Sequence, residues 1–91
     1  MNRPYISGVN MKRLGFVGII IEDRLKAAPL VNKVLSEYGE EIVARVGLPY
    51  KERHCRVITL TVDMSTDELG ALTGKLGAIE GVTVRSALAK N

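Results

Sequence analysis

The sequence predicts an α+β fold in which four strands and two helices alternate in the order βαββαβ. Two observations carry this prediction: segments whose apolar residues are continuous or alternate, as in strands, and two segments whose apolar residues recur at helical spacing. A chain of 91 residues is shorter than an average domain. We therefore expect residues 12–90 to form one domain, and residues 1–11, which lack hydrophobic periodicity, to be a flexible leader.

The first strand is predicted over residues 14–21, which are apolar at odd and even positions and interrupted only by Gly15 and Gly18. Such a pattern is typical of a central strand covered on both faces. Asp23 can cap the first helix, Pro29 is tolerated early in it, and Gly39 is placed to end it. The apolar residues at helical spacing in this segment are Ala27, Leu30, Val31, Val34, Leu35 and Tyr38.

The second and third strands are predicted over residues 41–48 and 54–64. In the second, Pro49 and Tyr50 are expected to end the strand, and residues 51–53 to connect it to the third. One face of the second strand is expected to carry Ile42, Ala44, Val46 and Leu48, and the other Val43, Arg45 and Gly47. One face of the third is expected to carry Ile58, Leu60, Val62 and Met64.

The second helix is predicted to begin after Ser65 or Thr66, either of which can cap it, and to end by Gly81. Its buried stripe consists of Leu69, Leu72, Leu76 and Ile79, and the fourth strand follows over residues 82–88. The element order predicts a ferredoxin-like sandwich: a four-stranded antiparallel sheet with both helices on one face. The first and third strands, the most apolar of the four, are central in that topology.

Two helices on one face leave the other face of the sheet uncovered. In the first strand that face is apolar in either register, because Phe16 and Ile20 alternate with Val17, Ile19 and Ile21. An exposed apolar patch of this size is unfavourable in water. We therefore expect a partner subunit, a small ligand or both on this face.

Composition and charge exclude several classes of protein. A hydrophobic content of 46% with 25% charged residues is that of a folded globular chain, and residues 14–21 are too short to span a bilayer. We expect a cytoplasmic protein without membrane contact.

The net charge of +3 is spread along the chain. Lys51, Arg53 and Arg56 come closest to a basic cluster, and we interpret them as a solvated loop rather than a phosphate-binding patch. Where the first strand passes into the first helix, the acidic Glu22 and Asp23 favour capping of the helix over binding of an anion at its N-terminus.

Three glycines, Gly70, Gly74 and Gly77, fall within the second helix and group roughly 140° away from its leucine stripe on a helical wheel. Each interior glycine costs about 0.5–1 kcal/mol relative to alanine. Close approach of another backbone or of a ligand would offset this cost, and a helix that ends near Gly74 or Gly77 is the alternative.

Residues 70–76 resemble a P-loop, but they have one residue too few between the glycines. They also place Leu76 where a P-loop has the serine or threonine that binds magnesium, so nucleotide hydrolysis is excluded.

The chain has one histidine and one cysteine, and these are the neighbours His54 and Cys55. Adjacent strand residues point to opposite faces, and a transition metal takes three or four ligands. A metal site would therefore need ligands from a second subunit, and we expect no cofactor.

Residues 31–35, 45–50, 70–77 and 81–84 carry a family resemblance, and the similarity spans residues 14–88. The chain resembles small proteins described as proposed regulators of the iron-only ([FeFe]) hydrogenase system, which are related in shape to ACT domains and to the C-terminal domain of the nickel-responsive regulator. Many members have glycine and methionine where this chain has Ala44 and Val46. The resemblance implies an ACT-like, oligomeric sensor that is not an enzyme. The sequence contains no DNA-binding helix-turn-helix, so direct DNA binding is not expected.

Our first hypothesis is a regulatory module that forms a homo-oligomer, a dimer or a tetramer, with a small effector at the subunit boundary. Arg45, Tyr50 and Lys75 are the candidate ligand-binding residues, and the plain alternative is a solvated arginine, a packing tyrosine and a surface lysine. The glycines of the second helix are candidate interface residues. The competing hypothesis is a metal sensor that combines His54 and Cys55 from two subunits. A third hypothesis, a ferredoxin-fold enzyme that acts on small organic substrates, is not favoured, because the sequence offers no credible general base.

Overall fold

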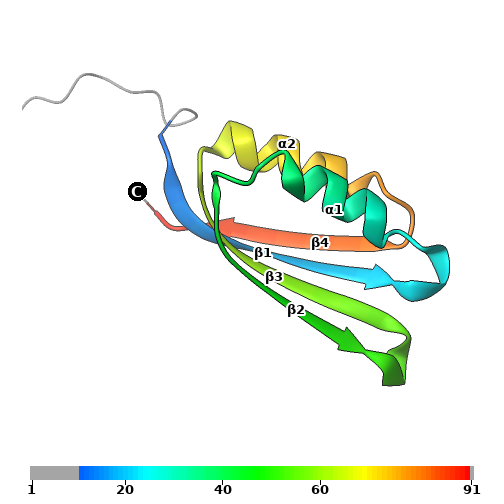
Figure 1. The fold of residues 1–91 in the computed structure, drawn as a ribbon. Helices are drawn as coiled ribbons and strands as arrows, with labels where there is room; N and C mark the ends of the chain where they lie inside the picture. Colours follow the sequence, from blue (N-terminus) through cyan, green and yellow to red (C-terminus); the bar gives the residue numbers. More distant parts are fainter. Residues whose placement is uncertain (1–10, 91) are drawn as a thin grey trace, which may run out of the picture.

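The computed structural model describes residues 11–90 and shows the predicted order of elements (Figure 1). The leader predicted over residues 1–11 lies almost wholly outside the described residues. Short 3-10 helices, η1 and η2, join the regular elements, which are β1 (Arg13–Glu22), η1 (Asp23–Leu25), α1 (Ala28–Ser36), β2 (Ile42–Tyr50), η2 (Lys51–Arg53), β3 (Cys55–Met64), α2 (Thr66–Gly77) and β4 (Val82–Leu88).

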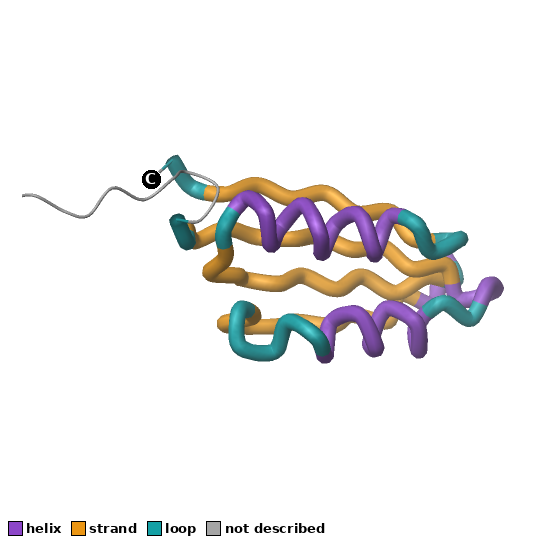
Figure 2. Tube along the Cα trace, turned by 90° about the horizontal axis from the view of Figure 1, so that it is seen from above, coloured by secondary structure: helices purple, strands orange, loops and turns teal. Residues whose placement is uncertain are grey.

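The sheet is antiparallel with the strand order β2-β3-β1-β4, so the first and third strands are central as predicted. Both helices lie side by side over the same face of this sheet (Figures 1 and 2). The ferredoxin-like βαββαβ architecture is therefore confirmed. No helix within residues 11–90 has the length and apolar character needed to cross a membrane.

The hydrophobic core lies between the helices and the sheet. Alternate residues of β1 and β3 point into it, and the predicted face of β3 is buried. Leu72 and Leu76 of the predicted α2 stripe are fully buried, while Leu69 and Ile79 are partly buried against the core. Each such aliphatic side chain contributes about 1.5–3 kcal/mol by leaving water. The largest fully buried side chains are Ile19, Ile21, Leu60, Met64, Leu72, Leu76, Val17, Val31 and Val62.

The second strand differs from the prediction in its register. A bulge between Ile42 and Ala44 places Ile42 opposite Val62, on the helix-covered face, and Ala44 opposite Thr61, on the other face. The prediction that Ile42 shares a face with Ala44, Val46 and Leu48 was therefore wrong. A bulge inserts one extra residue, which switches the side-chain alternation beyond it.

The second strand also continues through Pro49 and Tyr50, which pair with Arg56 and Cys55. The predicted end at residue 48 was wrong because β2 is an edge strand. Along one side of an edge strand no partner requires a backbone donor, so a proline is tolerated there. Residues 51–53 form the connection as predicted, in a 3-10 turn.

The first helix begins and ends differently from the prediction. Asp23 opens η1 instead of capping α1, which begins at Ala28 without a side-chain cap. The helix ends at Ser36, because the chain turns at Tyr38, whose carbonyl accepts hydrogen bonds from the amides of Glu41 (3.0 Å) and Ile42 (3.1 Å). Gly39 is therefore not the residue that ends the helix.

The second helix ends at Gly77, before Gly81, which agrees with the alternative prediction of a helix that ends near Gly74 or Gly77. Gly81 has φ +85°, and a Cβ there would lie 2.7 Å from the Cδ1 atom of Leu25. Only glycine adopts this conformation without strain. Gly81 therefore serves the tight turn into β4 rather than the end of α2.

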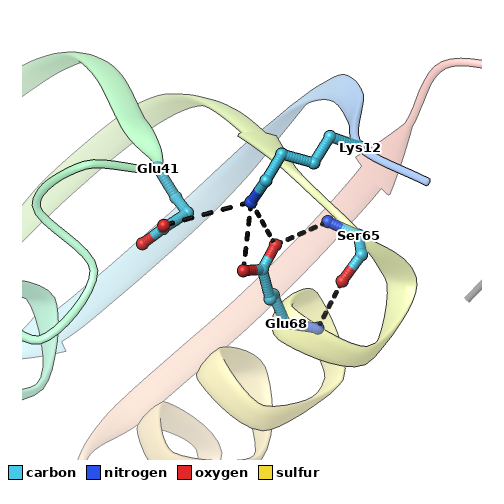
Figure 3. A network of polar contacts seen from close by, with 4 residues as sticks. All are labelled: Lys12, Glu41, Ser65 and Glu68. Carbon is cyan, nitrogen blue, oxygen red and sulfur yellow. Dashed lines mark hydrogen bonds and ion pairs between the residues drawn. The ribbon is translucent and has the colours of Figure 1, made fainter. Parts of the chain in front are cut away.

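The N-terminus of α2 holds a polar cluster of Lys12, Glu41, Ser65 and Glu68 (Figure 3). The Ser65 hydroxyl accepts a hydrogen bond from the Glu68 amide (3.1 Å), and the Glu68 carboxylate accepts one from the Ser65 amide (2.9 Å). Of the two predicted caps, Ser65 and Thr66, the capping box therefore uses Ser65, and Thr66 is the first residue of the helix. Lys12 Nζ lies 2.9 Å from Glu68 Oε1 and 4.0 Å from Glu41 Oε2. The cluster joins the residue before β1 to the first turn of α2.

Hydrogen bonding shifts the pKa values of Glu68 and Lys12, the two charged partners of the shortest ion pair in the cluster. The Ser65 amide, followed by the Lys12 ammonium, lowers the pKa of the Glu68 carboxyl below its ordinary value of 4.5. The hydrogen bond to Glu68 raises the pKa of Lys12. Both shifts favour the ion pair at neutral pH.

Substituting Ser65→Ala is expected to lower the free energy of unfolding by about 1 kcal/mol, because the first turn of α2 loses its capping oxygen. Chemical denaturation monitored by circular dichroism measures the change. Ser65→Thr keeps a hydroxyl and should retain most of the stability. Equal losses of stability in the two variants would show that the Ser65 hydroxyl is not the source of the stabilisation.

The charge of Glu68 should make stability depend on pH. Because the pKa of Glu68 is lowered on folding, its stabilisation is present above its ordinary value and is lost as the pH falls through the lowered value. Glu68→Gln keeps the cap but removes the charge, so it should cost about 0.5 kcal/mol at pH 7, typical of an exposed ion pair, and less at pH 3, which lies below the ordinary pKa of 4.5. Denaturation at both pH values measures this difference, with exposed Glu80→Gln as control. If Glu68→Gln lowers the stability equally at both pH values, this prediction is contradicted.

Candidate functional site

The sheet surface turned away from the helices is called the open face here. Strand register places on it residues from all four strands, with β1 and β3 in its centre. Its members are Leu14, Phe16, Gly18, Ile20 and Glu22 of β1, Ala44, Val46, Leu48 and Tyr50 of β2, Cys55, Val57, Thr59, Thr61 and Asp63 of β3, and Thr83, Arg85 and Ala87 of β4.

The open face is apolar and exposed, as the sequence predicts. Phe16 is 58% exposed, Ile20 45% and Val46 66%, and nothing within residues 11–90 covers them. Charged residues lie near its margins, with Glu22 and Asp63 near opposite ends of the central strands and Arg85 on the edge strand β4. An apolar centre with a charged rim is the organisation of a protein interface.

The dimensions of the open face suit association with a second protein surface. Seven residues of each strand, the length of β4, across four strands span about 23 by 19 Å, or about 440 Å² in projection. Side chains that rise from this plane increase the accessible area. The projected area is about half of the roughly 800 Å² that each partner buries in a stable interface, before the relief of the side chains is counted.

The predicted ligand residue Arg45 lies on the other side of the sheet. It pairs in register with buried Leu60, which places its side chain on the helix-covered side of β2. There Arg45 Nη2 donates a hydrogen bond to Asn32 Oδ1 of α1, over 2.6 Å. Arg45 thus links the edge strand to the first helix.

Lys75 also lies on the helix side. Its Nζ is 2.9 Å from Glu37 Oε1 and 5.4 Å from the centre of the Tyr38 ring, and the hydrogen bond to Glu37 raises the pKa of Lys75. Tyr50, by contrast, lies on the open face at the end of β2. One protomer therefore does not bring the three predicted ligand residues together.

The α2 glycines face away from the core. All three are exposed. A Cβ added at Gly70 or Gly74 would meet no atom within 4 Å, and one at Gly77 would make ordinary contact, 3.7 Å, with Val84. The helix continues through Gly74 and ends at Gly77. Packing within one protomer therefore does not require glycine at positions 70 and 74.

The prediction that His54 belongs to the third strand was wrong. His54 is the left-handed residue that ends η2, with φ +52°, and β3 begins at Cys55. Cys55 is half-buried and pairs with Glu22 and Tyr50. Residues 11–90 contain no group of three or more His, Cys, Asp or Glu side chains that could hold a metal ion.

One feature of the surface was missed from the sequence. Glu22, Arg24, Arg53 and His54 line an open depression at the end of the sheet where β1 finishes and β3 begins. The sequence places these residues in two unrelated loops. The antiparallel pairing of Glu22 with Cys55 brings them together, and a predicted strand register was the signal that could have shown it.

Comparison with protein families decides the relationship of the chain. Residues 13–86 match the model of the TM1266-like family, described as a proposed iron-only hydrogenase system regulator. The chain belongs to this family. It is 42% identical to the uncharacterized protein TM1266 from Thermotoga maritima, with a TM-score of 0.83 and coverage of 87% of this chain and 99% of that one.

Two more distant solved structures share the fold of this TM1266-like protein. The ACT domain from GTP pyrophosphokinase of Chlorobium tepidum is 24% identical, with a TM-score of 0.72 and coverage of 85% of this chain and 100% of that one. A functionally unknown protein from Pediococcus pentosaceus is 10% identical, with a TM-score of 0.54 and coverage of 87% and 94%. The fold is thus ACT-like. Comparison with curated proteins gives no match.

Substituting Gly74→Ala tests what the α2 glycines do. Because a Cβ at this position meets open space, alanine should raise the free energy of unfolding of the protomer by about 1 kcal/mol. Denaturation at low protein concentration measures this effect. If the glycines form an interface, the same variant should also weaken self-association in sedimentation experiments, whereas Lys33→Ala on the exposed surface of α1 should not. A destabilised protomer would contradict the prediction.

Proposed function

We propose that this TM1266-like protein is a cytoplasmic regulatory module of the iron-only hydrogenase system, without catalysis of its own, that self-associates and holds a small effector at a subunit boundary. The observation that carries the proposal is the open face, an apolar sheet surface that the chain itself leaves exposed. Family membership and the ACT-like fold support a regulatory role.

Self-association follows from the free energy of the open face in water. Burying apolar surface contributes about 25 cal/mol per Å², and an isologous dimer buries the same patch on both subunits. Threonines on β3 and β4 are tolerated in such an interface because their methyl groups are apolar. Glu22 and Asp63, near the strand ends, remain at the wet rim. A second copy of the chain is therefore the proposed partner.

The effector would contact different residues according to the assembly. In a dimer through the open faces, Tyr50 lies at the boundary because it ends β2 on that face. Arg45 and Lys75 would reach an effector only where another copy approaches the helix side, next to Gly70, Gly74 and Gly77. A tetramer that uses both sides would employ all of these residues.

The decisive experiment compares two charge insertions at exposed apolar positions. Phe16 is 58% exposed on the open face, and Leu30 is 55% exposed on α1. We expect the wild-type chain and Leu30→Glu to sediment as the same oligomer at micromolar concentration, and Phe16→Glu to sediment as a monomer, because it buries an unpaired charge in the interface. Adding a small-molecule cell extract should shift the association of the wild-type chain.

Two results would contradict this proposal. A wild-type chain that remains monomeric at micromolar concentration would remove the interface. Dissociation of both variants would move the interface away from the open face. Far-UV circular dichroism confirms that each variant remains folded.

A further inference from the structure

The end of the sheet where β1 finishes and β3 begins carries two 3-10 turns that lie together. η1 follows β1 and η2 precedes β3, and the Asp23 amide donates a hydrogen bond to the His54 carbonyl over 3.0 Å. Asp23 and His54 are 31 residues apart in the sequence, and this bond joins their two turns into one structural unit. Figure 1 shows the two turns at the same end of the sheet.

Both turns end in a left-handed residue that is not glycine. Lys26 and His54 each have φ +52°, and their amides donate to the carbonyls of Asp23 and Lys51, each over 3.1 Å. Left-handed conformations are uncommon for residues with a side chain. At position 54 this conformation is combined with an imidazole that lines the neighbouring depression, and residues held in sparsely populated conformations cluster at ligand sites.

The depression has a volume of about 510 Å³ and is lined by Glu22, Arg24, Arg53 and His54. Arg24 Nη2 lies 3.3 Å from Glu22 Oε1, and the two side chains are 79% and 49% exposed. Such an exposed pair is weak, so it leaves guanidinium donors of Arg24 free for a ligand. Within residues 11–90 no hydrogen bond or ion pair engages the side chains of Arg53 and His54.

The charge around the depression favours an anion. Of the charged residues in the lining, Arg24 and Arg53 are basic and Glu22 is acidic, so their formal charges sum to +1. The sequence taken segment by segment indicates a solvated loop and an acidic helix entry, whereas the fold combines them into one basic end.

We propose that this depression binds the oxyanion group, phosphate or carboxylate, of a small molecule. The planar guanidinium groups of Arg24 and Arg53 match the geometry of such a group and can each donate two hydrogen bonds to it. His54 adds a ring nitrogen as a donor. Glu22 is the internal competitor, because a bound oxyanion takes over the donors of Arg24 that Glu22 engages. The site lies within one chain and does not depend on self-association.

Isothermal titration of the full-length protein with inorganic phosphate and, separately, with citrate tests the proposal at constant pH and ionic strength. We expect saturable binding of at least one probe with one site per chain. Arg53→Gln should weaken it about tenfold, as expected for loss of a hydrogen bond to a charged group. Glu22→Gln should strengthen it about threefold, because it removes the competing carboxylate. Binding of phosphate alone assigns a phosphorylated ligand, and binding of citrate alone assigns a carboxylate.

Matched controls separate a built site from general charge. Lys33→Gln and Glu40→Gln make the same charge changes on exposed surface away from the depression and should leave the affinity unchanged. His54→Asn should also weaken binding, and asparagine accepts the left-handed conformation, so this variant tests the site even if Arg53→Gln fails to fold. No saturable binding of either probe, or equal weakening by Lys33→Gln and Arg53→Gln, would overturn the proposal. Neither result bears on the sedimentation experiment above.

Discussion

The structure depends on one constraint: β1 is a central strand that is apolar on both faces, and two helices can cover only one of them. Val17, Ile19 and Ile21 are buried beneath the helices, while Phe16 and Ile20 emerge on the opposite surface. The same strand therefore anchors the core of the protomer and forms the centre of the open face. Stability of the protomer and its proposed association have a common origin.

The remaining polar chemistry is separated from that apolar centre. Capping and ion pairing of Lys12, Ser65 and Glu68 stabilise the start of α2 (Figure 3). The turns that carry Arg24, Arg53 and His54 lie where β1 ends and β3 begins. In the proposals made above, the open face serves another copy of the chain and the basic end serves a small anion, and the two sites meet at Glu22, which lies at the rim of the first and lines the second.

Much of the fold could be predicted because it is encoded in local patterns. The alternation of Ile58, Leu60, Val62 and Met64, and the Ser65 cap followed by a leucine stripe, each depend on short-range periodicity that one segment reveals by itself. The errors fall where pairing between segments decides the outcome. The bulge at residues 42–44 reversed one position of β2, and its edge location allowed the strand to pass through Pro49. Neither property is visible in the segment alone.

The sequence by itself determined the order of the elements and the apolar character of both faces of β1, because side-chain polarity at period two is a local property. Only the tertiary structure decided which of those faces the helices bury. It also placed Arg45 and Lys75 on the opposite side of the sheet from Tyr50, and it brought Arg24 and Arg53 to the same depression. These outcomes depend on strand register and on helix packing, which join residues that are distant along the chain and carry no mark of each other in their own segments.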